Sequence, residues 1–133
     1  MLSTDERFKL FVYGTLKYGE GNNAFLIERG AEFVCEATAD GIFLLDLGPF
    51  PAAIEEEGYQ VVGELWVIDK DTLDTLDVLE GYSEKDHRGS LYLRKIVKTN
   101  VGNAFTYIYN DITGGIANGF EKKSYWGRGE KGG

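Results

Sequence analysis

The segment Tyr13–Leu16 is the first of three places where residue types and spacing could support chemistry. An apolar run ends there in a glycine, and a turn follows directly. At such a turn, successive backbone N–H groups can converge and bind an anion or a polarised carbonyl oxygen. The alternative is an ordinary turn that ends a strand, because glycine marks loops in many proteins.

Glu80 is the second candidate. It follows Leu73, Leu76 and Leu79, whose helical spacing predicts a buried stripe. A carboxylate at the C-terminus of a helix faces the negative end of the helix dipole, and partial burial adds to that effect, so both are expected to raise its pKa. Such a carboxyl suits proton transfer near neutral pH. The alternative is a solvated glutamate beside the helix cap Gly81.

The acidic run Glu55–Glu57 is the third candidate, and it is interpreted as a solvated loop between strands. Metal binding is the alternative, but it needs ligands that converge from several directions. His87 is interpreted as a loop residue and Cys35 as a core residue, although a spatial triad with His87 stays open. One Cys and one His are too few for a zinc site of the usual Cys/His kind, whereas a hard cation bound by carboxylates stays open, although no calcium-loop spacing is visible.

The elements that must position these residues are mostly short strands. Asp69 or Asp71 is expected to cap the start of the later of two helices, and the segment Leu47–Pro51 is expected to be a loop. Because the order is not a regular β-α-β repeat, a doubly wound parallel sheet is not expected. The pattern predicts strands over Phe8–Tyr13, Phe33–Ala37, Gly41–Leu45, Tyr59–Ile68, Leu91–Thr99 and Ala104–Tyr109, and helices over Asn23–Glu28 and from Thr72 onward.

Length and composition limit the classes of protein. The 133 residues are enough for one domain, expected over residues 7–126 between flexible termini at 1–6 and 127–133. A net charge of -8 disfavours nucleic acid as a partner, and no apolar run is long enough to span a membrane. The single cysteine fits a reducing compartment, so a cytoplasmic location is expected.

These segments, in this order, resemble the γ-glutamylcyclotransferase superfamily, in particular its AIG2-like and γ-glutamylamine cyclotransferase-like branch. The run FVYGTLKYGEGN is similar to the family's signature turn, and PFPAAI to its proline-containing loop. The unit GELWVIDKDTLDTLDVLEGY resembles the strand and helix that end in the family's catalytic glutamate, and YLRKIVKT with AFTYIY resembles its last hairpin. The resemblance implies an α+β fold: a small mixed β-barrel with short flanking helices.

The resemblance also implies an enzyme of the transferase or C–N lyase type. The α-amine of a γ-glutamyl amide attacks its own δ-carbonyl and releases 5-oxoproline and a free amine, with Glu80 as general acid and base. No cofactor is implied, and the partner is a small γ-glutamyl substrate bound by a monomer or weak homodimer. The substrate-binding residues implied are Tyr13, Gly14, Thr15, Leu16, Pro51, Tyr92 and Tyr109.

Other functions on the same fold stay open. The substrate could be a γ-glutamylated biosynthetic intermediate, or the chain could be a non-catalytic binding module or a plain interaction domain. The leaving amine is expected to point past Pro49–Pro51 and the charged segment Ser83–Arg88. Because loops adapt readily, amines from small alkyl groups to a lysine side chain are expected to be accepted.

Overall fold

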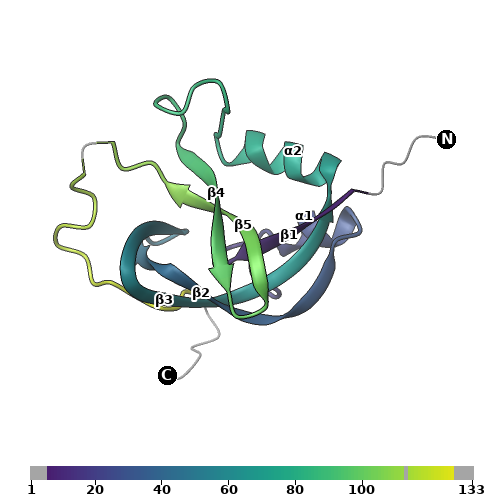
Figure 1. The fold of residues 1–133 in the computed structure, drawn as a ribbon, viewed down its shortest axis with the longest axis horizontal. Helices are drawn as coiled ribbons and strands as arrows, with labels where there is room; N and C mark the ends of the chain where they lie inside the picture. Colours follow the sequence, from purple (N-terminus) through teal and green to yellow (C-terminus); the bar gives the residue numbers. More distant parts are fainter. Residues whose placement is uncertain (1–5, 113, 128–133) are drawn as a thin grey trace.

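The computed structural model describes residues 6–112 and 114–127, which form a closed five-stranded barrel flanked by two helices (Figure 1). The strands join in the order β1-β3-β2-β4-β5; β1 and β5 run parallel, and the other pairs run antiparallel. The predicted small mixed barrel is therefore confirmed. The elements are β1 (Arg7–Val12), α1 (Asn23–Glu28), β2 (Glu32–Asp46), β3 (Pro51–Asp69), α2 (Lys70–Leu79), β4 (Tyr92–Thr99) and β5 (Gly102–Tyr109).

Strand β1 is buried on both faces. Phe11 belongs to the hydrophobic cluster that it shares with residues of all the other strands. Leu10 and Val12, on the opposite face, pack in a second cluster that includes Leu26 of α1 and Leu73 of α2. Because side chains alternate along a strand, the two faces of β1 pack in two different apolar clusters. The strand ends directly before the Tyr13–Leu16 turn.

Strands β2 and β3 are each longer than the sequence pattern predicts. The two strands expected over Phe33–Ala37 and Gly41–Leu45 form one strand, because Gly41, at φ +82°, bends it without ending it. The strand expected from Tyr59 begins at Pro51, and Gly58, at φ +97°, makes the matching bend. The register between β2 and β3 shifts at this point, and such irregularities let a small sheet curve into a barrel.

The acidic run Glu55–Glu57 therefore lies within β3, and its prediction as a loop is wrong. All three residues are exposed, as their charges require. Glu55 pairs with Lys95 at 2.7 Å, and Glu56 lies 3.5 Å from Lys122. Cys35 is only partly buried, beside a register shift of β2, and packs against the barrel cluster.

Helix α2 begins at a side-chain cap and ends at a glycine. The Asp69 carboxylate accepts a hydrogen bond from the backbone N–H of Thr72 at 2.8 Å, which is the cap that the sequence predicts. Leu73 and Leu76 are buried, but the predicted third member of the stripe, Leu79, is 62% exposed. Leu79 lies in the last turn, beyond the residues of α2 that pack in the core, so the predicted stripe stops at Leu76.

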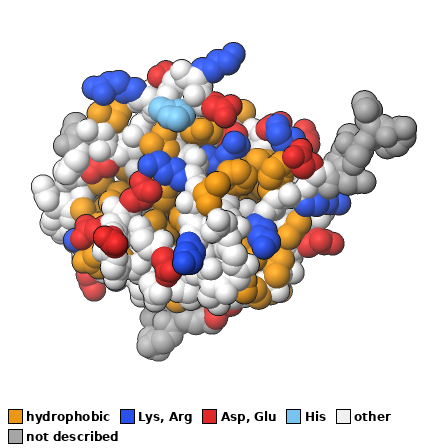
Figure 2. Space-filling view, in the orientation of Figure 1, with side chains coloured by type: hydrophobic (Ala, Val, Ile, Leu, Met, Phe, Trp, Pro, Cys, Tyr) orange, Lys and Arg blue, Asp and Glu red, His pale blue; other side chains and the backbone are white. Residues whose placement is uncertain are grey.

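The segment after β5 returns to the β2 and β3 side of the barrel (Figure 1). The backbones of Leu44 and Lys123 exchange two hydrogen bonds of 2.8 Å, and Val62 N–H donates to the carbonyl of Ser124. On the face drawn in Figure 2, acidic and basic side chains alternate around hydrophobic ones without a basic stripe. Among the described residues, no helix is long and apolar enough to cross a membrane. The predicted flexible termini lie outside the described residues, apart from Glu6 and Gly127.

Candidate active site

A cavity of about 410 Å³ opens at the end of β1. The segment Leu10–Leu16 forms one wall, and the loop 49–51 lies beside it. Leu79 and Glu80 at the end of α2, together with residues of β4 and β5, line the remaining wall. The volume is in the range of small-molecule sites.

The backbone of the Tyr13–Leu16 turn is held by hydrogen bonds to its carbonyl groups. Lys17 N–H donates to the Gly14 carbonyl, Asn22 N–H to the Thr15 carbonyl at 2.8 Å, and the Asn23 side chain to the Leu16 carbonyl at 2.8 Å. Within residues 6–112 and 114–127, no backbone carbonyl accepts from the N–H groups of Gly14, Thr15 or Leu16. The turn can therefore offer N–H donors to an anion or an oxyanion.

Gly14 is needed because the ring of Pro51 packs directly on it. A Cβ atom at Gly14 would lie 2.8 Å from two ring carbons of Pro51, closer than side chains tolerate. The contact joins the turn to the start of β3, so both predicted residues line the same cavity.

Glu80 follows the last residue of α2 and faces this cavity. Gly81, at φ +69°, turns the chain away directly afterwards. Burial raises the pKa of Glu80 to about 7. The sequence predicted a raised pKa from the helix dipole and from burial together. In the structure, the increase in the pKa of Glu80 comes from desolvation by burial.

Three tyrosines surround the carboxyl group. Burial raises the pKa of Tyr13, Tyr92 and Tyr107, and the charge of Glu80 adds to each increase. Their hydroxyl groups are therefore neutral, and each donates its proton to the protein. Tyr13 donates to the carbonyl of Tyr107 at 2.5 Å and Tyr92 to that of Pro51 at 3.1 Å, whereas Tyr107 donates to the Asp77 carboxylate at 2.7 Å.

Tyr109, which the sequence predicted as a binding residue, is not among the residues that line the cavity. Its ring packs edge-on against Tyr92 with centroids 5.6 Å apart. Tyr107, two residues earlier on β5, lines the cavity instead. Because side chains alternate along β5, Tyr107 and Tyr109 lie on the same face of the strand. Their position along the strand then decides which of them reaches the cavity.

Asp77 is a second carboxylate in the last turn of α2 that the sequence analysis missed. It accepts hydrogen bonds from Tyr107 at 2.7 Å and from Arg94 of β4 at 2.6 Å. The Arg94 guanidinium also lies over the ring of Phe105, 4.8 Å from its centroid. Asp77 precedes Glu80 by three residues and so lies on a similar face of the helix, a spacing that could have indicated it. These bonds attach the end of α2 to the β4–β5 hairpin.

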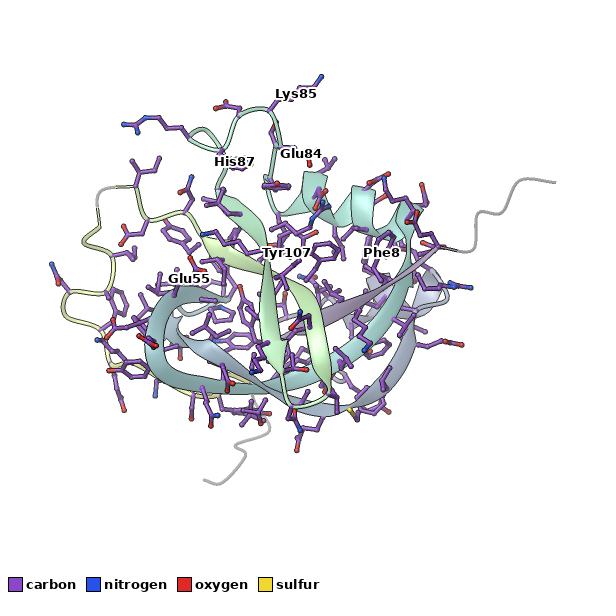
Figure 3. All side chains as sticks on the ribbon, in the orientation of Figure 1. Phe8, Glu55, Glu84, Lys85, His87 and Tyr107 are labelled. Carbon is purple, nitrogen blue, oxygen red and sulfur yellow. The ribbon has the colours of Figure 1, made fainter. Side chains whose placement is uncertain are left out.

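The other predicted candidates lie outside the cavity. Figure 3 shows Glu84, Lys85 and His87 on a loop that extends beyond the barrel, whereas Tyr107 lies between β5 and α2. His87 approaches the hydroxyl of Tyr82, at 3.4 Å. The described part of the chain contains no group of three His, Cys, Asp or Glu side chains that could hold a metal ion.

A cavity of this size, with one carboxyl group and a turn of N–H donors, is suited to a small polar molecule. The sequence matches the family described as gamma-glutamyl cyclotransferase, AIG2-like, over residues 10–127. The chain therefore belongs to this family, as its motifs predicted.

Individual relatives agree with the family match. The chain is 32% identical to the gamma-glutamylcyclotransferase family protein YtfP of Escherichia coli K12 over 108 residues, which cover 81% of this chain and 88% of that protein. It is 36% identical to gamma-glutamylaminecyclotransferase A of Danio rerio over 112 residues, covering 78% and 69%. The crystal structure of an AIG2-like protein from Mus musculus has a TM-score of 0.76 at 20% identity, covering 96% and 93%, which supports the fold alone.

Proposed function

We propose that this chain is an enzyme that converts a γ-glutamyl amide into 5-oxoproline and a free amine. One observation carries the proposal: the Glu80 carboxyl lines the same cavity as the Tyr13–Leu16 turn, and burial raises its pKa to about 7. A carboxyl group that is half-ionised near neutral pH can both accept a proton and return it.

The reaction needs no nucleophile from the protein. The substrate's α-amino nitrogen attacks its δ-carbonyl carbon, and a five-membered ring forms through a tetrahedral intermediate. Glu80 first accepts a proton from the α-ammonium group, which frees the electron pair that attacks the δ-carbon. It donates this proton to the amide nitrogen as the bond from that nitrogen to the δ-carbon breaks, and the second proton that the ring nitrogen loses leaves with the released amine as an ammonium ion. Because ring closure is intramolecular, the principal task of the cavity is to hold the glutamyl group folded.

The walls of the cavity suit the two charged ends of that group. The N–H groups of Gly14, Thr15 and Leu16 would bind the α-carboxylate or the developing oxyanion. Tyr92 and Tyr107 already donate their hydroxyl protons to protein acceptors, so toward a substrate their oxygens can only accept hydrogen bonds. They would bind the α-ammonium group beside Glu80.

The test is release of 5-oxoproline from a panel of γ-glutamyl amines, γ-glutamyl dipeptides and glutathione. We expect turnover of at least one free γ-glutamyl compound and none of its N-acetylated counterpart, because acetylation removes the nucleophile. Equal turnover of the acetylated compound would exclude intramolecular attack. Binding without release of 5-oxoproline would instead favour a non-catalytic binding module.

The proposal includes a cytoplasmic location and a monomeric or weakly dimeric state. The groups to which the reaction is assigned here, Glu80 and the Tyr13–Leu16 turn, belong to the same copy of the chain. Sedimentation of the purified protein across a concentration series would measure its oligomeric state.

A further inference from the structure

Three large apolar side chains lie at the mouth of the cavity and are open to solvent. Phe50 is 42% exposed, Leu79 62% and Leu91 53%, and all three line the cavity that contains Glu80. They come from the loop before β3, the end of α2 and the residue before β4. We call these three residues the apolar mouth. Apolar groups from three separate segments that meet around one opening mark a binding surface.

The backbone of the apolar mouth is anchored by hydrogen bonds. Leu91 N–H donates to the carbonyl of Gly81 at 2.9 Å, and the Leu91 carbonyl accepts from Asn110 at 3.0 Å. The Phe50 carbonyl accepts from Leu47 N–H at 3.1 Å, and the next residue, Pro51, packs on Gly14. The backbone at Phe50 and at Leu91 is therefore held by hydrogen bonds on both sides of the opening.

None of the described residues at this opening offers a cationic side chain. Among the described residues that line the cavity, Glu80 is the only one with a charged side chain. The buried Lys17 turns its ammonium toward the carbonyl of Trp126 and the ring of Tyr125, and Arg94 pairs with Asp77. The charged segment Ser83–Arg88 does not line the cavity either. A carboxylate on the leaving amine would find no partner there and would be repelled by Glu80.

We propose that the apolar mouth is the subsite for the leaving amine and that it selects γ-glutamyl amides of uncharged, apolar amines. This inference rests on the proposed function, because it assigns the part of the substrate that extends outward from Glu80. It narrows the expected range of leaving groups: an alkyl amine contacts the mouth, whereas an amino acid brings a carboxylate to it.

The experiment measures kcat/KM for γ-glutamyl methyl-, ethyl-, propyl- and butylamide, with γ-glutamylglycine and Nε-γ-glutamyl-lysine for comparison. We expect kcat/KM to rise about two- to threefold with each added methylene, because each one is partly withdrawn from water. The butylamide should exceed γ-glutamylglycine by more than about tenfold. A flat series, or a preference for γ-glutamylglycine, would overturn the inference.

Two variants test whether the mouth causes this selectivity. Leu91→Ser should flatten the chain-length series, and Leu91→Lys should raise kcat/KM for γ-glutamylglycine relative to the butylamide. The matched control is Val78→Ser, because Val78 is 77% exposed and adjacent to Leu79 but does not line the cavity. The control should keep the wild-type series. If Leu91→Ser keeps that series as well, the inference is wrong.

The outcomes separate the inference from the proposed function. If the wild-type protein releases no 5-oxoproline from any free γ-glutamyl compound, both fail. If it releases 5-oxoproline from the alkylamides and the dipeptide at equal rates, the proposed function stands and the apolar mouth is not a selectivity subsite.

Discussion

Asp77 lies in the last turn of α2, and Glu80 follows directly after that helix, but the surroundings of the two carboxylates differ. Asp77 is held by a guanidinium and a hydroxyl group at 2.6 and 2.7 Å. Glu80 faces a cavity whose walls raise its pKa to about 7. A carboxylate with fixed partners is suited to holding elements together, whereas one without them is suited to exchanging protons. Both are carboxylates at the end of the same helix, so the difference comes from the residues of the barrel that surround each of them.

The largest effect should follow from Glu80→Gln, which keeps the shape of the side chain but cannot accept a proton at neutral pH. We expect kcat for 5-oxoproline release to fall by about a hundredfold or more, the usual scale for a general acid and base. Asp74→Asn is the matched control, because Asp74 lies on the same helix in an exposed ion pair with Lys70. A rate near that of the wild type in Glu80→Gln would contradict the proposed role.

Replacing Asp77 should mainly lower the stability of the protein, whereas Glu80→Gln should mainly lower the rate of the reaction. Asp77→Ala leaves the mostly buried Arg94 without its counter-ion and the Tyr107 hydroxyl without its acceptor. We expect the free energy of unfolding to fall by about 2–3 kcal/mol, measured by denaturant titration. Asp74→Ala should cost less than about 0.5 kcal/mol, because its ion pair is exposed. If Asp77→Ala leaves stability unchanged and Glu80→Gln lowers it, the comparison between the two carboxylates is reversed.

The raised pKa of Glu80 makes a prediction about pH. The folded protein holds this proton up to about pH 7, whereas an unfolded chain loses it near the ordinary value of 4.5. Glu80 therefore contributes stability that is fully present below about pH 4.5 and is lost as pH rises toward 7. Glutamine imitates the protonated form at every pH. At pH 8, Glu80→Gln should be more stable than the wild type by on the order of 2 kcal/mol.

The measurement is the free energy of unfolding of both proteins at pH 4.5 and pH 8. The difference should nearly disappear at the lower pH, where the carboxyl group is neutral in the folded protein and only half-ionised in the unfolded chain. A difference that is independent of pH would show that the glutamine acts through packing. The kcat/KM of the wild type should decline as pH falls through 7, since the ionised carboxylate is the form that accepts a proton.

The smallest expected effect is that of a metal chelator. The proposed reaction uses a nucleophile from the substrate and a carboxyl from the protein, so incubation with EDTA should leave the rate of 5-oxoproline release unchanged. A rate lost to EDTA and restored by Mg²⁺ or Zn²⁺ would mean that a cation supplies a charge partner for one of the carboxylates. The exposed run Glu55–Glu57 would then be the first place to substitute.

Local sequence patterns alone determine several elements of this protein and the residues at their ends. Helix α1 spans the predicted residues, and Asp69 caps α2 as its position suggested. The Tyr13–Leu16 turn and the place of Glu80 after the last residue of α2 also follow from neighbours in the chain. Turns, caps and helix ends depend on a few consecutive residues, so sequence alone contains the necessary information.

Other features were decided only when the barrel closed. The bends at Gly41 and Gly58 continue strands that local patterns would end, because pairing between β2 and β3 resumes on both sides. Position along β5 brings Tyr107 and not Tyr109 to the cavity, and β4 brings Arg94 to Asp77. Burial by residues distant in the sequence sets the pKa of Glu80, since desolvation depends on every wall of the cavity. These properties belong to the assembled barrel, because no single segment contains all the groups that produce them.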